Sequence, residues 1–182
     1  SFEGFASNQN GWWYLEGGKV TFQKNDVIKG TVDGETTWWH VVNSKVTYDT
    51  TVAQNANGWW RIEEGKVNFN FTGIASNKNG TWYLDGGKVD FSYSGFYKNG
   101  TDYLYVENGQ ITYTKNDVIK GAVAAQSGWW HVVGSKVAFD TTVAKNSNGW
   151  WYIRGGKVDF GYNGNVWYHG HNYWVSNGWI RM

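Results

Sequence analysis

The sequence predicts an all-β solenoid of stacked β-hairpins. The sequence consists of two similar halves, because a shift of 91 residues aligns Lys24–Gly30 with the identical segment Lys115–Gly121. Inside each copy, a unit that reads roughly Gly-Trp-Trp-Tyr-Leu, a two-residue turn and Lys-Val-Asp-Phe recurs four times, at a period of 21 to 26 residues. A unit this short cannot bury an apolar face alone, so about eight units must stack. We therefore expect residues 1–182 to form a single repeat domain with internal copies 1–91 and 92–182.

The first unit shows how each hairpin is built. Trp12–Glu16 alternates in polarity as a strand does, Gly17-Gly18 is a two-residue turn, and Lys19–Phe22 returns. Most of the turn pairs suit the positive φ values of type I′ turns. The equivalent pairs are Asn43-Ser44, Glu64-Gly65, Gly86-Gly87, Asn108-Gly109, Gly134-Ser135, Gly155-Gly156 and Asn177-Gly178.

The turn sets the register, and the register assigns the faces. Residues directly opposite each other share a face, which pairs Leu15 with Val20 and Trp13 with Phe22. All eight units carry apolar or aromatic residues at these four positions. They predict the core face, and the positions of Trp12 and Tyr14 then face outward.

The outward positions are the candidate ligand-binding residues. Aromatic residues make up 19% of the chain, with 14 Trp and 12 Tyr, and their flat faces suit stacking against sugars. For Trp12 and its equivalents, packing between repeats is an equal alternative; the position of Tyr14, where Tyr, His, Arg and Trp interchange, favours ligand contact. The predicted set is Trp12, Tyr14, Trp38, His40, Trp59, Arg61, Tyr83, Tyr105, Trp129, His131, Trp150, Tyr152 and Trp174.

Composition excludes several other functions. Sixteen Lys and Arg against fifteen Asp and Glu leave no basic face for nucleic acid. The chain has no cysteine and no recurring set of nucleophile, base and oxyanion donors, so we expect no enzyme and no cofactor. His169 and His171 lack a third metal ligand at a recognisable spacing, so no metal site is expected.

The chain carries no apolar run long enough for membrane insertion and no secretory signal pattern at Ser1. It therefore resembles a fragment of a longer protein, whose signal and anchor would lie outside these residues.

Three segments depart from the short period. Two units are longer by about four residues, and we expect the extra residues to form loops at Thr31–Thr37 and Ala122–Gly128. The final unit, with Asn165–Tyr168 and Trp179, is expected to be a terminal cap or the most specialised site.

The repeated Gly-Trp-Trp-Tyr-Leu, glycine turn and short returning strand resemble the cell-wall-binding repeats of Gram-positive surface proteins, the group that includes choline-binding and glucan-binding repeats. The resemblance covers essentially the whole chain and implies stacked hairpins with aromatic sites between them. The choline-type repeat also places Gly-Trp ahead of its hairpin. Here that place holds Gly4-Phe5, Gly73-Ile74, Gly95-Phe96 or, at Thr51-Val52, no glycine. One wall of a choline cage is therefore expected to be missing, and nearby lysines would repel a cation.

These observations predict a non-catalytic binding module of a bacterial surface or secreted protein. The expected ligand is carbohydrate, either a cell-wall polysaccharide or a glucan, bound at several matched sites. The first alternative is an adhesin domain that binds a host protein such as a glycoprotein or immunoglobulin, because Trp, Tyr and Arg dominate protein interfaces. The second alternative is a structural stalk without a ligand.

Overall fold

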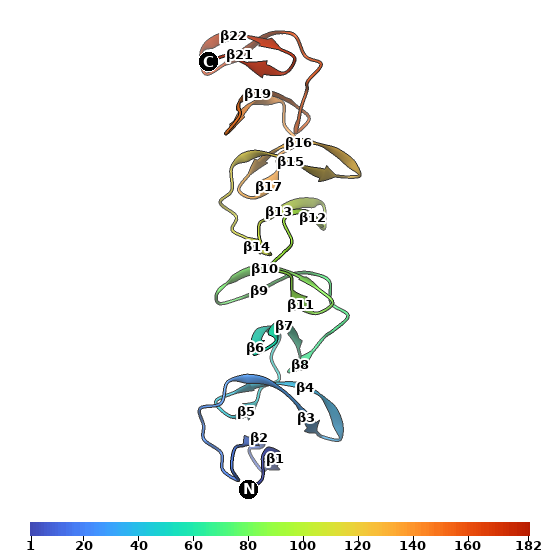
Figure 1. The fold of residues 1–182 in the computed structure, drawn as a ribbon, viewed down its shortest axis with the longest axis vertical. Helices are drawn as coiled ribbons and strands as arrows, with labels where there is room; N and C mark the ends of the chain where they lie inside the picture. Colours follow the sequence, from blue (N-terminus) through green and yellow to red (C-terminus); the bar gives the residue numbers. More distant parts are fainter. The chain divides into compact units, whose positions relative to one another are not determined.

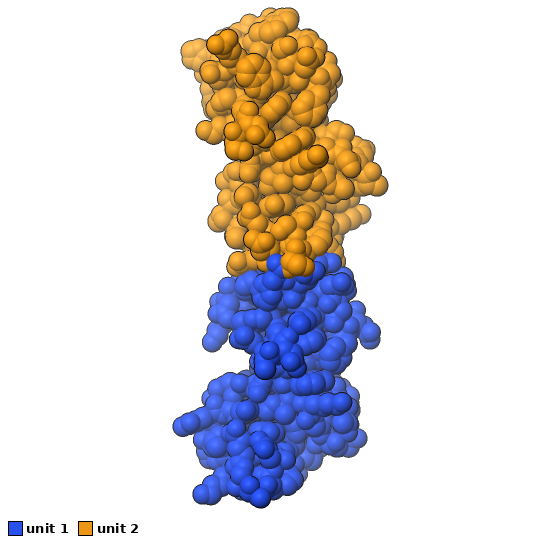
Figure 2. Space-filling model, in the orientation of Figure 1, with its two compact units in different colours: residues 1–91 blue, residues 92–182 orange.

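The computed structural model describes residues 1–182 and consists of strands and turns. The chain divides into two compact units, residues 1–91 and 92–182 (Figure 2). Unit 1 contains β1 (Gly4–Asn8), β2 (Gly11–Leu15), β3 (Asp26–Val32), β4 (Glu35–Val42), β5 (Lys45–Val46), β6 (Thr51–Asn55), β7 (Gly58–Glu63), β8 (Lys66–Val67), β9 (Gly73–Asn77), β10 (Gly80–Asp85) and β11 (Lys88–Val89).

Unit 2 contains β12 (Gly95–Asn99), β13 (Asp102–Val106), β14 (Gln110–Ile111), β15 (Asp117–Val123), β16 (Gln126–Val133), β17 (Lys136–Val137), β18 (Thr142–Asn146), β19 (Gly149–Arg154), β20 (Lys157–Val158), β21 (Gly164–Tyr168), β22 (His171–Ser176) and β23 (Trp179–Ile180). The predicted all-β architecture of repeated hairpins is confirmed (Figure 1). None of the chain forms a helix of the length and apolarity needed to cross a membrane.

Most repeats have three strands, of which the repeat pattern predicts only the second and third. In the third repeat, β6 pairs antiparallel with β7, which places Ala53 opposite Trp60. The short strand β8 then returns along β7, with Ile62 opposite Val67. The first strand carries few apolar residues in a regular alternation, so its pairing is visible only in three dimensions. The first and second strands therefore form the longer hairpin of the repeat, which we call its main hairpin, and the predicted turn joins the second strand to the short third strand.

The third strand joins neighbouring repeats. Lys66 of β8 lies opposite Trp39 of β4, and Lys88 of β11 lies opposite Trp60 of β7. Backbone hydrogen bonds add to this contact, because the Arg61 N–H donates to the Gly87 carbonyl at 2.7 Å. Each turn is thus held by the preceding repeat, which supplies the partners that a single short repeat lacks.

The predicted turns are confirmed. Both residues of all eight turn pairs have positive φ, between 48° and 85°, as type I′ geometry requires. The predicted core positions of Leu15 and Val20 are confirmed as well. Their equivalents are buried in the other seven repeats, as Ile62, Leu84 and Ile153 show with no exposed surface.

The prediction that Phe22 and its equivalents belong to the core is wrong. The returning strand ends after its second residue, so the chain has left the sheet when it reaches this position. Each side chain keeps between 46% and 63% of its surface exposed. The eight exposed residues are Phe22, Tyr48, Phe69, Phe91, Tyr113, Phe139, Phe160 and Met182.

The prediction that Trp12 and its equivalents face outward is also wrong for the tryptophans. Trp12 packs on the cluster of Val32, Trp39 and Val46 in the next repeat. Trp38, Trp59, Trp129 and Trp150 pack in the same way on the core clusters of the repeats that follow them. The packing alternative describes these positions, because a large aromatic side chain buries surface that a small repeat needs.

The segments predicted as loops are the ends of long hairpins. Strands β3 and β4 continue through residues 31–37, with Thr31 opposite Thr36, and turn at Asp33-Gly34. Residues 122–128 do the same in β15 and β16, with Ala122 opposite Ser127. The extra residues lengthen the two strands of each hairpin, because on both sides of the two-residue turn successive side chains continue to alternate between the two faces of the sheet.

Candidate ligand-binding site

A pair of aromatic side chains recurs at the edge of the repeats, and we call it the aromatic corner. It consists of the residue at the Trp13 position and the exposed residue at the Phe22 position. Ring centroids lie 5.5 to 6.3 Å apart with interplanar angles of 68° to 76°, the edge-to-face geometry that aromatic quadrupoles favour. The corners are Trp13–Phe22, Trp39–Tyr48, Trp60–Phe69, Trp82–Phe91, Trp130–Phe139 and Trp151–Phe160.

The preceding repeat adds a third aromatic wall. In unit 1, Trp38 lines a pocket of about 270 Å³ together with Trp60 and Phe69, and we call this pocket the Trp60 site. Its remaining walls come from Asn55, Asn57, Val67 and Lys88. The Trp38 side chain thus serves two purposes, since it packs on the core of the next repeat and also lines the pocket. The Trp60 corner therefore has a third aromatic side chain beside it.

Asparagine side chains fix the orientation of four of the six corner tryptophans, Trp13, Trp60, Trp82 and Trp151. Asn55 Oδ1 accepts a hydrogen bond from Trp60 Nε1 at 2.9 Å, while Asn55 Nδ2 donates to the Val27 carbonyl of the preceding repeat at 3.1 Å. Asn146 holds Trp151 in the same way, with a bond of 3.0 Å. A buried indole N–H that is already paired keeps the ring in place before any ligand arrives.

Lysines of the following repeat lie over several corners. Lys88 Nζ lies 5.4 Å from the Trp60 ring centroid, and Lys45 Nζ lies 5.3 Å from that of Trp13. Lys66 and Lys157 occupy the same place over Trp39 and Trp130, at 5.9 and 5.7 Å. These distances are within the range of cation–π attraction. The corner faces therefore attract positive charge.

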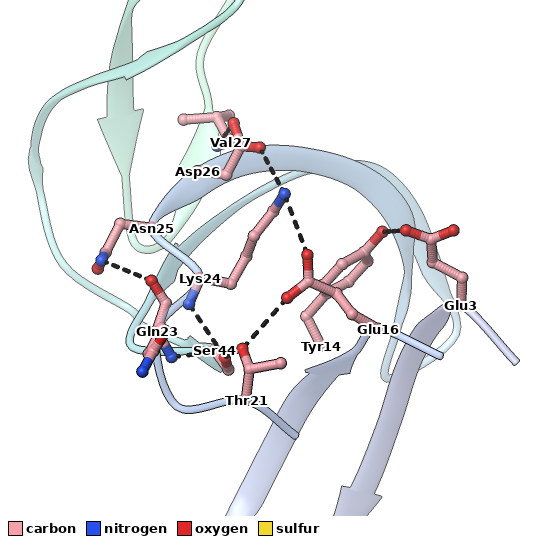
Figure 3. Close-up of polar contacts among 10 residues, drawn as sticks. All are labelled: Glu3, Tyr14, Glu16, Thr21, Gln23, Lys24, Asn25, Asp26, Val27 and Ser44. Carbon is pink, nitrogen blue, oxygen red and sulfur yellow. Dashed lines mark hydrogen bonds and ion pairs between the residues drawn. The ribbon is translucent and has the colours of Figure 1, made fainter. Parts of the chain in front are cut away.

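The position of Tyr14 forms a separate set of contacts. The Tyr14 ring packs edge-on against the Phe5 ring, with centroids 5.3 Å apart. Lys24 Nζ lies 5.9 Å from the Tyr14 ring centroid. Figure 3 shows Tyr14 and Lys24 together with the carboxylates of Glu3, Glu16 and Asp26. Burial and the Glu3 carboxylate, which accepts a hydrogen bond from the phenol at 3.3 Å, raise the pKa of Tyr14. Burial disfavours the charged form of Lys24, but Asp26 and Glu16, each with an oxygen 3.5 Å from Nζ, outweigh it and raise the Lys24 pKa.

The other residues at this position have local partners as well. His40 Nδ1 lies 2.7 Å from an oxygen of Asp49, and the equivalent distance from His131 to Asp140 is 2.8 Å. Arg61 stacks over Phe71 at 4.7 Å. Hydrogen bonds from Asn68 and from Arg61 lower the pKa of Glu63.

In unit 2, Tyr152 stacks on Tyr162 with centroids 4.1 Å apart, and Tyr105 lies against Phe96 at 5.5 Å. Tyr83 is half-buried. Trp174, with 62% of its surface exposed, is the one tryptophan at this position. The structure thus places Trp38 in the Trp60 site and brings residues of the two predicted positions together in two other pockets, where Tyr14 lies with Trp38 and His40 lies with Trp59.

The repeat pattern does not identify the exposed member of each corner as a site residue. Phe22 and its equivalents have an apolar identity in all eight repeats, which is the signature of a core position. No group of three or more His, Asp or Glu side chains is arranged to hold a metal ion.

A family model described as a choline-binding repeat matches residues 1–21, 29–47, 48–68, 70–90, 92–112 and 139–159, more than half of the chain. The chain belongs to the choline-binding repeat family. In unit 1, the matched segments 1–21, 48–68 and 70–90 each begin a few residues before the first strand of a repeat, which is β1, β6 or β9. The resemblance to cell-wall-binding repeats of the choline-binding group is therefore confirmed.

Among solved structures, 24 chains match. One is the structure of CbpJ from Streptococcus pneumoniae TIGR4, at 17% sequence identity and a TM-score of 0.36. The match covers 99% of this chain and 52% of CbpJ, so the chain spans about half of that structure's length. No curated protein matches the chain.

Proposed function

We propose that this chain is a non-catalytic module that binds choline-bearing polymers of a bacterial cell wall, as part of a cell-surface or secreted protein. The observation that carries the proposal is a recurring arrangement in which a tryptophan of the preceding repeat lies beside an aromatic corner, as Trp38 does in the pocket with Trp60 and Phe69. The equivalent residues in unit 2 are Trp129, Trp151 and Phe160. A quaternary ammonium group has no hydrogen-bond donor and is attracted by the negative faces of aromatic rings. Membership of the choline-binding repeat family supports the same ligand.

Sites in both units favour multivalent binding. A polymer that carries many choline groups can engage more than one corner, such as Trp82–Phe91 in unit 1 and Trp151–Phe160 in unit 2, and the second contact is then intramolecular. Weak individual sites would then suffice to retain the protein on a wall. The corners offer aromatic faces, amides and lysines, and this supports binding rather than catalysis.

Free choline is expected to change the tryptophan fluorescence of the chain in a saturable way. Phe160→Ala is the test variant, because Phe160 forms a corner with Trp151 but leaves half of its surface in solvent. We expect roughly tenfold weaker choline binding in this variant, with little change in stability. Calorimetric titration and fluorescence measure the binding.

Phe2→Ala is the matched control, because Phe2 is an exposed aromatic residue that belongs to no corner. It should bind choline as the wild-type chain does. An unchanged affinity in Phe160→Ala, or the absence of any response to choline in the wild-type chain, would contradict the proposal. Retention of a host protein instead of choline would favour the adhesin, and no ligand at all would favour the stalk.

Direct carbohydrate contact is a second candidate function, favoured by the terminal hairpin. On β21 and β22, Trp167 lies opposite Asn172 and Trp174 lies opposite Asn165, so the four side chains share one face. Trp167 is 71% exposed, although residues at the equivalent position elsewhere are small or polar, such as Ser76. Flat indole faces beside amide groups suit a pyranose ring, through stacking and hydrogen bonds.

Soluble wall or glucan oligosaccharides are expected to bind this face with millimolar affinity and to lose most of that binding in Trp167→Ser, which installs the residue of the equivalent position. A glycan array followed by fluorescence titration measures the effect. Phe160→Ala should leave the sugar response unchanged. If Trp167→Ser binds every glycan as the wild-type chain does, the terminal hairpin is not a carbohydrate site.

A further inference from the structure

Two equivalent pockets in the chain differ at one wall. The Trp60 site in unit 1 is built from Trp38, Trp60, Phe69 and Lys88. The residues 91 positions later are Trp129, Trp151, Phe160 and Trp179, which we call the Trp151 site. Three of the four residues are therefore the same type in both sites, and lysine is replaced by tryptophan at the fourth.

The backbone places Lys88 and Trp179 in equivalent positions. Lys88 lies opposite Trp60 in the pairing of β11 with β7, and Trp179 lies opposite Trp151 in the pairing of β23 with β19. Both side chains also cross a glycine of the preceding repeat. A Cβ on Gly58 would lie 2.5 Å from Lys88 Cε, and a Cβ on Gly149 would lie 2.9 Å from Trp179 Nε1. The two side chains therefore lie in the same place against the same strand.

Lys88 brings a positive charge into the Trp60 site. Its Nζ lies 5.4 Å from the Trp60 ring centroid, and the side chain lines the pocket. No carboxylate lies within 4.0 Å of this ammonium group, whereas Lys66 over the Trp39 corner is paired with Glu35 at 3.1 Å. The aromatic walls of the Trp60 site are the principal partners that the structure offers to the Lys88 charge.

In the Trp151 site the same place adds an aromatic face and no charge. Trp129 and Trp151 pack on one core cluster, Phe160 forms the corner with Trp151, and Trp179 remains 43% exposed. An incoming cation would meet four aromatic side chains here. In the Trp60 site it would meet three, together with a like charge at close range.

We infer that the residue at this position decides whether a corner accepts an external quaternary ammonium group: Lys88 closes the Trp60 site with the chain's own cation, and Trp179 leaves the Trp151 site open. This inference rests on the proposed function. Lys88 then stabilises the stacking of the repeats, because it contacts aromatic side chains of the two repeats that precede its own. Lys157 over Trp130 closes its corner by the same physics.

The reciprocal exchange Lys88→Trp and Trp179→Lys tests the inference, with choline as the probe and calorimetric titration of the full chain as the measurement. Trp179→Lys should weaken binding at the Trp151 site roughly tenfold or more, and Lys88→Trp should add a binding site. Lys88→Met is the matched control, because it keeps the alkyl stem and removes the charge. It should admit choline more weakly than Lys88→Trp. Far-UV circular dichroism and thermal melting establish that each variant is folded.

A second measurement is independent of choline. In the wild-type chain, the ε-methylene protons of Lys88 should show an upfield ring-current shift in NMR spectra, and Trp60→Leu should remove it. Unshifted Lys88 protons, Trp179→Lys binding like wild type, or Lys88→Trp without an added site would each overturn the inference. A wild-type chain that binds no choline would overturn the proposed function instead, and the proton shift would still test the placement of Lys88.

Discussion

Gly87→Ala is expected to lower the free energy of unfolding of unit 1 by about 3 kcal/mol or more. Gly87 has a φ of 82°, and a Cβ there would lie 2.4 Å from the Asn68 carbonyl oxygen and 2.9 Å from the Phe69 Cα. Both contacts are with backbone of the preceding repeat, which cannot rotate away as a side chain can. The Gly87 carbonyl also accepts the Arg61 N–H, and its own N–H donates to the Phe71 carbonyl. Displacement of this turn would therefore weaken the join between two repeats. Urea denaturation followed by circular dichroism measures the loss.

Gly18→Ala is the matched control for this substitution. Gly18 occupies the same turn position with a φ of 80°, and a Cβ there would meet nothing within 4 Å. It should cost only about 1 kcal/mol, the penalty of a left-handed backbone for alanine. Equal losses in the two variants would show that backbone conformation alone, and not the contact between repeats, requires glycine at Gly87.

The second large effect is expected from Ile62→Ala, at about 3 kcal/mol. Ile62 is fully buried in the cluster of Val27, Ala53 and Val67, so its removal leaves a cavity between repeats. Phe69→Ala removes a larger side chain, yet it should cost only about 1 kcal/mol, because Phe69 is 46% exposed and mainly contacts the edge of Trp60. Urea denaturation compares the two variants.

The repeat pattern assigns Ile62 and Phe69 to the same core face, whereas the structure buries Ile62 and exposes Phe69. Comparison of the two variants therefore tests which description of Phe69 is correct. A loss in Phe69→Ala as large as that in Ile62→Ala would contradict the exposed aromatic corner. Hydrogen exchange of the β7 amides offers an independent readout, since only loss of core packing should increase their exchange.

Local features of the fold could be predicted because they depend on neighbouring residues. The two-residue turns require positive φ at both positions, and Gly, Asn and Ser at these places indicate it. The turn then defines the register that pairs Ile62 with Val67. Eight copies of one pattern strengthen each of these predictions, since every repeat must satisfy the same geometry.

Features that depend on contacts between repeats could not be predicted in this way. The exposure of Phe69 follows from the end of β8 after two residues, where Lys66 pairs with Trp39 of the preceding repeat. The burial of Trp38 follows from the core of the next repeat, on which it packs. Nothing within a single repeat distinguishes an apolar residue that packs on a neighbour from one that lines a pocket.

The sequence by itself determined the repeat, its turns, the buried Leu15 and Val20 positions and the all-β class, because these follow from local backbone preference and alternation. Only the tertiary structure decided which aromatic residues meet. Trp38, Trp60 and Phe69 come from two repeats and Lys88 from a third, so the pocket exists only after stacking. These side chains meet because strands of different repeats pair in a particular register, and the repeat period alone does not specify that register.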